Sequence, residues 1–173
     1  KAADALFAGV ATHFVSAEDC SALVDRLAIA DNVDDCLSQH AQDFGQAPLA
    51  EHKKDIDRHF GANNVEEIVS SLHASGSEWA RKTAGIMATK SPTSQKITLE
   101  QLTRGAMNDF EDCMQIEFRI VNRIFDGHDF FEGIRAVVID KDQTPKWQPD
   151  CLAQVSEDAV ARYFAPLDKE LPV

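Results

Sequence analysis

The sequence predicts a mainly α-helical chain, and three observations support this prediction. Apolar residues recur at spacings of three and four along most of the 173 residues, which is the period of an amphipathic helix. Serine and asparagine precede several of these stretches and glycine follows them, as expected of helix caps. At most one short extended piece is expected, near the segment "ATHFV". We therefore expect one helical region over residues 1–173, without repeats or low-complexity tracts.

The first predicted helices lie in the N-terminal third of the chain. The segment "SAEDCSALVDRLAIA" opens with Ser16, and Asp19 follows three residues later, a weaker form of the capping box. Its apolar stripe consists of Cys20, Leu23, Val24 and Leu27. The segment "LAEHKKDIDRHF" repeats the pattern, and Gly61 is a natural residue to end that helix. Its stripe consists of Leu49, Ile56 and Phe60.

The middle of the chain carries the clearest helix boundaries. In "NNVEEIVSSLHASG", Asn64 stands three residues before Glu67, which fits an N-cap, and Gly76 ends the segment. Ser77 starts the next predicted helix, "SEWARKTAGIMATK". The Ser91-Pro92 pair starts "SPTSQKITLEQLTRG", because proline suits the first position of a helix.

The longest predicted helix is "MNDFEDCMQIEFRIVNRIFDG". A wide and mostly apolar face runs along it, made of Phe110, Cys113, Met114, Glu117, Phe118, Val121, Ile124 and Phe125. Since exposed apolar surface costs about 25 cal/mol per Å², this face is expected to pack on other helices, another copy or another domain. A last helix, "SEDAVARYF", is expected to start at Ser156 and to end before Pro166.

Composition excludes several classes of function. The net charge of −12 disfavours nucleic acid and anionic membranes as partners, because both require a basic surface. The chain has no apolar run of about 18 residues that would span a membrane. The cysteines are far apart, which favours reduced thiols in a cytosolic or organellar compartment. They are Cys20, Cys36, Cys113 and Cys151.

The residues alone contain no convincing catalytic or metal-binding pattern. His52 and His59 are seven positions apart and could share a helix face, but a metal site needs further ligands, so surface histidines are the favoured interpretation. Cys113 lies in an apolar stripe and is interpreted as a buried, inert thiol. Adjacent acids such as Asp34-Asp35 point apart around a helix, which favours a solvated face over acid and base catalysis. We therefore expect no metal and no catalytic residue.

Three stretches resemble a known family. They are "AGVATHFV" near the start, "SPTSQKITLEQL", and "GHDFFEGIRAVVIDKDQTPKW" near the end. The last one begins as a helix, passes through "AVVID" as a strand would, and ends in a tail with Lys, Gln and Pro. Together they resemble the C-terminal half of the 3-hydroxyisobutyryl-CoA hydrolase branch of the enoyl-CoA hydratase/isomerase (crotonase) superfamily. The resemblance covers nearly the whole chain and is weakest over residues 30–62.

The resemblance implies the C-terminal helical portion of a crotonase-like α/β fold, with the β-rich N-terminal core absent from this chain. Residues 1–15 would be the end of that core, 16–90 a variable helical segment, and 91–173 a trimerisation and CoA-side segment. In the family, the acyl-CoA pocket, the oxyanion-hole amides and the catalytic carboxylates precede "AGVATHFV". The resemblance therefore assigns no catalytic residue to this chain, and the fragment alone is expected to be inactive.

The resemblance also implies a CoA-binding role for the tail that follows residue 134. In the family, this helix and its basic continuation lie near the trimer interface and beside the CoA nucleotide, whose phosphates are polyanionic. The matching cations here are Arg135, Lys141 and Lys146. Acids are interleaved with these cations, so a second interpretation stays open, in which Lys141 pairs with a neighbouring Asp on the surface.

Glu132 and Gly133 are expected to serve packing. The glycine would let another backbone approach, and the glutamate would bond within the turn.

The expected intact protein is an enzyme that hydrolyses the thioester of 3-hydroxyisobutyryl-CoA in valine breakdown, with no cofactor beyond the CoA of its substrate. Its expected partners are its own N-terminal core and further copies of itself, and its expected location is the bacterial cytoplasm or the mitochondrial matrix. Two alternatives remain: a family member that acts on another short acyl-CoA, and a non-catalytic helical interaction protein.

Overall fold

The computed structural model describes residues 1–172, which divide into two compact units, Lys1–Arg58 and a second unit from His59 onward. Helices form both units, and no strand occurs between residues 1 and 172. The mainly α-helical prediction is therefore confirmed. The expected extended piece at "ATHFV" forms no strand, although the backbone N–H of Gln42 donates to the carbonyl of Phe14 over 2.9 Å.

The first unit consists of short helices with little buried surface. They are α1 (Ala2–Phe7), α2 (Cys20–Leu27), α3 (Val33–His40), α4 (Pro48–Glu51) and α5 (Lys53–His59), whose last residue belongs to the second unit. Helix α1 contacts α4, and Asp4 accepts a hydrogen bond from the backbone N–H of Leu49 over 2.9 Å. Helices α2 and α3 contact each other. The buried residues described in this unit are Ala3 and Cys36.

Several sequence predictions for this unit were wrong in detail. The helix expected from Ser16 begins at Cys20, because the Ser16 hydroxyl closes a turn by accepting the N–H of Asp19 over 3.2 Å. The helix expected over residues 49–60 is two helices, interrupted at His52. Helices α1 and α3 were not predicted, although Asn32 caps α3 through the N–H of Asp34.

The second unit follows the predicted helices closely. The observed helices of this unit are α6 (Val65–Ser75), α7 (Glu78–Ala88), α8 (Pro92–Gly105), α9 (Phe110–Ile124), α10 (His128–Ile134), the π-helix η1 (Arg135–Ile139), the 3₁₀-helix η2 (Leu152–Gln154) and α11 (Glu157–Phe164). The predicted caps Asn64, Ser77 and Ser156 each accept a backbone N–H three residues on. Ser91 does the same ahead of α8. Gly76 adopts φ +68°, the left-handed conformation that ends α6.

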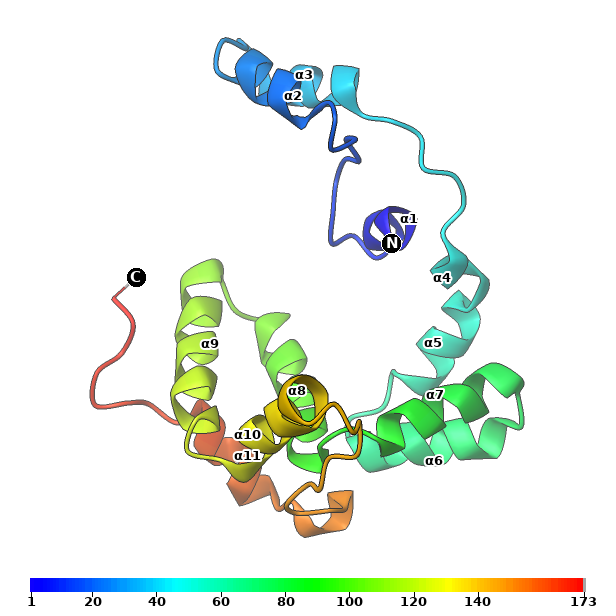
Figure 1. The fold of residues 1–173 in the computed structure, drawn as a ribbon, viewed down its shortest axis with the longest axis vertical. Coiled ribbons are helices and arrows are strands. Elements are labelled where there is room, and N and C mark those ends of the chain that lie inside the picture. The colour runs from blue at the N-terminus through cyan, green and yellow to red at the C-terminus, as the bar shows by residue number, and fades with distance from the viewer. Residues whose placement is uncertain (173) are drawn as a thin grey trace. The chain divides into compact units, whose positions relative to one another are not determined.

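Helices α6 and α7 form an antiparallel hairpin with its own core, and the two lie side by side in Figure 1. We call this core the α6–α7 cluster; its buried members are Ile68, Leu72, Ala80 and Ala84. His59 is also buried, and its Nδ1 lies 2.7 Å from the Ser71 hydroxyl. The His59 ring stacks on Trp79. The small alanines let the two helices approach closely, which is why the hairpin buries its side chains well.

The other core of this unit lies between α8, α9 and α11. We call it the α8–α9–α11 cluster; its buried members are Ile97, Ile116, Ile120, Val155, Val160 and Phe164. The residues of α9 that are buried in this core are Ile116 and Ile120, and Ile124 of the predicted face packs against them. Within the predicted face, Phe110 is 77% exposed and Phe125 is 50% exposed.

None of the helices described in residues 1–172 combines the length and the apolar character that crossing a bilayer requires.

Candidate functional site

The stretch from Gly127 to Pro149 forms a helix, a π-helical turn and a loop. Helix α10 passes directly into η1, where the N–H of Asp140 donates to the carbonyl of Arg135 over 2.8 Å, the i to i+5 bond of a π-helix. The segment "AVVID", which read as a strand, is thus helical. The N–H of Gln143 then bonds to the carbonyl of Ala136 over 3.0 Å and turns the loop back on the helix.

Arg135 is the centre of this turn and holds three carboxylates. Its Nε and Nη2 donate to the two oxygens of Glu132 over 2.9 and 2.8 Å, which is a bidentate pair. Its Nη1 donates to Asp140 over 2.6 Å and to Asp142 over 2.7 Å. Nη2 also lies 3.4 Å from the carbonyl oxygen of Thr144. The guanidinium therefore ties α10 to the loop that follows η1.

These contacts change the proton affinities of the groups that make them. The hydrogen bonds from Arg135 and from the N–H of Lys146 lower the pKa of Glu132 to about 2. The pKa of Asp142 is also lowered, first by Arg135 and then by the N–H of Thr144. The pKa of Arg135 is raised by its three carboxylate partners. All of these groups are therefore charged near neutral pH.

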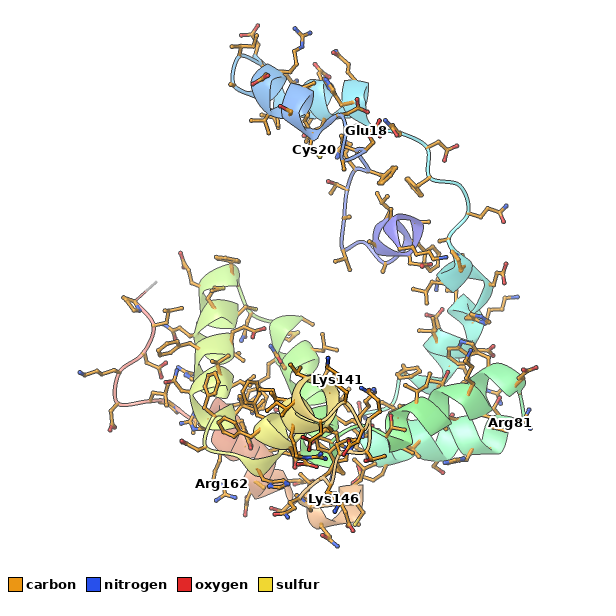
Figure 2. The ribbon with its side chains drawn as sticks, viewed as in Figure 1. Glu18, Cys20, Arg81, Lys141, Lys146 and Arg162 are labelled. Atoms are coloured by element: carbon orange, nitrogen blue, oxygen red, sulfur yellow. The ribbon has the colours of Figure 1, made fainter. Side chains whose placement is uncertain are left out.

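The two predicted lysines lie on the loop held by Arg135 (Figure 2). Both are exposed, and neither ammonium forms an ion pair or a hydrogen bond with any residue between 1 and 172. Lys141 and Gln143 have φ +57°, a left-handed conformation that is unfavourable for residues other than glycine. The interpretation in which Lys141 pairs with Asp140 or Asp142 is wrong, because both carboxylates face Arg135.

The rest of the loop is anchored on α10 and the end of α7. The indole N–H of Trp147 donates to the carbonyl of Thr89 over 3.0 Å. A Cβ at Gly133 would lie 3.5 Å from the Trp147 ring, an ordinary van der Waals distance, so the neighbour of this glycine is an indole and not the backbone that was expected. Glu132 accepts the N–H of Lys146 over 2.7 Å, and its bonds to Arg135, three residues on, are the local bonding predicted for it.

Asp129 joins the loop to the start of α8. It accepts the hydroxyl of the buried Ser91 over 2.5 Å and the N–H of Gln148 over 2.8 Å. His128 Nε2 lies 2.9 Å from the carbonyl of Lys146. None of these bonds was predicted. They join positions that are 18, 19 and 38 residues apart, and no local sequence pattern reveals such pairs.

The structure thus brings the three predicted cations onto one short segment but gives them different surroundings. Arg135 is occupied by carboxylates, whereas Lys141 and Lys146 extend into solvent without a carboxylate partner in the described chain. Sequence reasoning treated the three as equivalent. An arginine five and seven residues before two aspartates was the available signal for the carboxylate cluster.

A cavity of about 530 Å³ lies between α6, α8 and α11. Lys96 lines it and is already engaged, since its ammonium bonds to Glu66 over 2.6 Å and to the carbonyl of Val155 over 2.9 Å. Burial acts to raise the pKa of Glu66, but the hydrogen bond and the charge of Lys96, together with a backbone hydrogen bond, outweigh it and the pKa is lowered. Arg104 lies over the ring of Phe164 and pairs with Glu100. Lys96 therefore joins α8 to α6, and Arg104 joins α8 to α11.

The histidines and cysteines considered from the sequence are dispersed. Residues 1–172 contain no group of three or more His, Cys, Asp or Glu side chains that could hold a metal ion. His59 is buried in the α6–α7 region, away from the surface position expected for it. Cys113 is half-buried and its thiol lies 3.9 Å from the carbonyl of Gly105.

A second apolar stripe runs along α9, about 120° around the helix from the stripe that enters the core. We call it the outer face of α9; its exposed members are Phe110, Met114, Val121 and Phe125. The ring of Phe125 meets Phe130 edge to face at 4.9 Å, which extends apolar surface onto α10. More exposed apolar side chains follow on α10 and η1, namely Phe131, Val137, Val138 and Ile139.

Comparison with known proteins gives a consistent result. The sequence model of the enoyl-CoA hydratase/isomerase family matches residues 1–164. The chain is 41% identical over 180 residues to the mitochondrial 3-hydroxyisobutyryl-CoA hydrolase of Danio rerio. The aligned region covers 98% of the chain and 47% of that protein. The human mitochondrial 3-hydroxyisobutyryl-CoA hydrolase is 37% identical over 177 residues, covering 96% and 46%. The chain spans about half the length of the curated relatives it matches.

Two crystal structures resemble the chain. A carnitinyl-CoA dehydratase from Mycobacterium thermoresistibile aligns with a TM-score of 0.84 and 37% identity, over 98% of this chain and 49% of that one. An enoyl-CoA hydratase from Rhodobacter sphaeroides 2.4.1 aligns with a TM-score of 0.79 and 32% identity, over 95% and 47%. The helices described above therefore match the helical portion of this fold.

Proposed function

The chain belongs to the enoyl-CoA hydratase/isomerase family, and on this premise we propose that it is part of an acyl-CoA thioester hydrolase. The proposed substrate is 3-hydroxyisobutyryl-CoA, an intermediate of valine breakdown. The observation that carries this proposal is the identity of about 40% with 3-hydroxyisobutyryl-CoA hydrolases over nearly the whole chain.

The proposed reaction is a hydrolysis that needs no metal and no cofactor. Overall, the thioester C–S bond breaks with the consumption of one water, and the products are 3-hydroxyisobutyrate and the thiol of CoA. Backbone amides would stabilise the oxyanion of the tetrahedral intermediate, and a carboxylate pair would act as nucleophile or base. We assign none of these groups to residues 1–173, which contribute helices and the CoA side of the site.

Within this chain, the proposed contribution to substrate binding comes from the loop after η1. Lys141 and Lys146 are exposed cations without carboxylate partners in the described residues, and CoA carries a 3′-phosphate and a diphosphate. Charge-assisted hydrogen bonds from ammonium groups to phosphate are among the stronger polar interactions. We therefore propose that residues 91–173 form the CoA side of the site, with residues 1–15 as the end of the core and 16–90 as a variable helical segment.

The test is the rate of CoA release from 3-hydroxyisobutyryl-CoA by the protein as its gene encodes it. Replacing Lys141→Ala and Lys146→Ala together should raise KM several-fold and leave kcat nearly unchanged, because uniform binding is lost. The double variant Lys54→Ala/Lys82→Ala removes two other exposed lysines and is the matched control. An unchanged KM would refute the phosphate role, and absence of hydrolysis would refute the substrate.

A second candidate function is the action of the same fold on another short acyl-CoA. The two similar crystal structures are a carnitinyl-CoA dehydratase and an enoyl-CoA hydratase, and their identities of 37% and 32% approach those of the hydrolases. A panel of short acyl-CoA and enoyl-CoA substrates separates the two candidates. Hydration of an enoyl-CoA that is faster than any thioester hydrolysis would favour the second.

The outer face of α9 supports a proposal about assembly. An exposed apolar patch beyond a few hundred Å² is uncommon on a soluble monomer. We propose that this face is covered in the protein by its own core or by further copies of the chain, and light scattering tests the number of copies. A monomer that binds no dye for exposed apolar surface would contradict this. A non-catalytic helical interaction protein would use the same face but would show no turnover.

The proposed location is the mitochondrial matrix in a eukaryote or the cytoplasm in a bacterium. The hydrolases it resembles carry the word mitochondrial in their names. Fluorescence microscopy or fractionation of the native host tests this location.

A further inference from the structure

Arg135 does not have the surroundings of a phosphate ligand. Every nitrogen of the guanidinium is engaged by a carboxylate. Nε and Nη2 donate to the two oxygens of Glu132, and Nη1 donates to Asp140 and Asp142. A phosphate that approached Arg135 would have to displace a carboxylate already bound. The three carboxylates also give this cluster a negative sum of charges, which disfavours an anion at this point.

Lys141 stands between two acids in the sequence, yet it does not pair with them. In a flexible "DKD" segment, each aspartate could reach the ammonium, and the pairing would cancel the charge that a phosphate needs. In the structure, Nη1 of Arg135 holds Asp140 at 2.6 Å and Asp142 at 2.7 Å. The ammonium of Lys141 is exposed and has no ion pair in residues 1–172.

The backbone conformation shows that surrounding contacts fix the arrangement of Lys141 between the two aspartates. Lys141 and Gln143, on either side of Asp142, both have φ +57°. Such a conformation persists only where surrounding contacts determine it. Those contacts are the bonds from Arg135 to Asp142, from the N–H of Thr144 to Asp142 over 2.9 Å, and from the N–H of Gln143 to Ala136.

We propose that Arg135 is a positioning residue, which draws Asp140 and Asp142 away from Lys141 and thereby leaves the Lys141 ammonium available to a phosphate group. This inference rests on the proposed function, because the phosphate is that of an acyl-CoA. It replaces the role of direct ligand that the sequence suggested for Arg135. Glu132 fixes the guanidinium from the helix side, so that Nη1 points at both aspartates.

The test is a double-mutant cycle on the protein as its gene encodes it, with free coenzyme A as the probe and calorimetry as the readout. The variants are Arg135→Gln, Asp140→Asn/Asp142→Asn, and their combination. If Arg135 acts by holding the acids, Arg135→Gln weakens CoA binding about five- to ten-fold, within the usual range of coupling between sites. The same change should weaken binding less than about two-fold once the acids are gone, because nothing remains to pair with Lys141.

A direct ligand would give a different pattern. Arg135→Gln would then weaken binding at least as much in the acid-free background as in the unchanged protein, and Asp140→Asn/Asp142→Asn would tighten binding strongly by freeing the guanidinium. Either result overturns the inference. Arg135→Lys should restore part of the affinity, since an ammonium can hold one aspartate but not two with the geometry of the guanidinium.

A further measurement leaves Arg135 untouched, in case its replacement prevents folding. Lys141→Ala should weaken CoA binding by the same factor in the unchanged protein and in Asp140→Asn/Asp142→Asn, because Arg135 already holds both acids away from the Lys141 ammonium. A much larger loss in the acid-free background would mean that the acids mask Lys141 in the unchanged protein, and would overturn the inference.

Failure of the proposed function would be recognised separately. Thioester hydrolysis is measured on the same preparations, and a protein that binds CoA with the expected cycle but hydrolyses no 3-hydroxyisobutyryl-CoA refutes the substrate and not the role of Arg135. A protein that does not bind CoA at all overturns the inference.

Discussion

The two compact units are built from similar helices but bury very different amounts of side chain. Both contain side-chain N-caps, such as Asn32 in the first unit and Asn64 in the second. The described residues of the first unit include two buried side chains, Ala3 and Cys36, whereas the second unit has two apolar cores. Capping therefore defines where a helix begins in either unit, and burial decides how firmly it is held.

The contrast in burial shows which helices the chain stabilises by itself. At about 25 cal/mol per Å² of apolar surface, the α6–α7 and α8–α9–α11 clusters supply the main favourable term for the second unit. The first unit has no comparable cluster among its described residues. Its helices α2 and α3 are expected to open more readily than α6 or α9, which paired substitutions can measure.

The largest expected difference comes from matched truncations of leucine. Leu72 is 1% exposed in the α6–α7 cluster, so Leu72→Ala should lower the free energy of unfolding by about 2–5 kcal/mol. Leu23 is half-buried on α2, and Leu23→Ala should cost about 1 kcal/mol or less. Urea unfolding followed by circular dichroism measures both. Equal losses would show that the first unit has a core of the same quality.

A smaller difference is expected from matched caps. Asn64 accepts the N–H of Glu67 over 2.8 Å, and Asn64→Ala should cost about 1 kcal/mol in the free energy of unfolding, because α6 is part of a core. Asn32 accepts the N–H of Asp34 over 2.9 Å, and Asn32→Ala should mainly reduce the helicity of α3. Hydrogen exchange resolves the two effects by segment. Global destabilisation by Asn32→Ala would contradict the comparison.

The smallest expected effect concerns pH. The folded-state pKa of Glu66 is lowered by Lys96 from its ordinary 4.5, so the pair stabilises the fold above that pH and loses its effect as the pH falls through the folded value. Because Glu66 is 43% exposed, the contribution is below about 1 kcal/mol.

The corresponding variant is Lys96→Met, whose free energy of unfolding should vary less than that of the unchanged protein between about pH 6 and about pH 3. The control is Lys53→Met, which removes the exposed pair with Asp57 in the first unit. Fluorescence-detected unfolding across this pH range measures both. An identical pH dependence for the two variants would show that burial of Lys96 adds nothing.

The sequence predicted the second unit better than the first for a physical reason. Asn64, Ser77 and Ser156 are local signals, since a cap and the N–H it accepts are three residues apart. The break between α4 and α5 at His52 has no comparable signal, because Leu49, Ile56 and Phe60 continue the same period across it.

The sequence did not resolve which part of the wide face of α9 meets the core, and this has a different cause. The helix carries two apolar stripes, and periodicity detects both without saying which one meets α8 and α11. The choice depends on Ile97 and Phe164, which are distant in sequence. The stripe of Phe110, Val121 and Phe125 is exposed in the described chain, so of the three expected coverings, which were other helices, another copy or another domain, the last two stay as predictions for it.

The sequence indicated where the candidate site lies but did not predict the different surroundings of its three cations. The resemblance directed attention to Arg135, Lys141 and Lys146, and the structure places all three on one turn and loop. Their different surroundings follow from a π-helical turn and two left-handed residues, which depend on the bonds of Arg135 to Asp140 and Asp142. Such conformations depend on the completed fold and have no periodic pattern in the sequence.

The docking of Trp147 also gives this loop an optical label of its own. The chain has two tryptophans, so replacing Trp79 with phenylalanine would leave emission from one indole, whose N–H bonds to Thr89 and whose ring lies against Gly133. Departure of the indole from that position would expose it to water and shift its emission to longer wavelength. Stopped-flow fluorescence could then time the opening and closing of the loop directly, without a dye and without a chemical step.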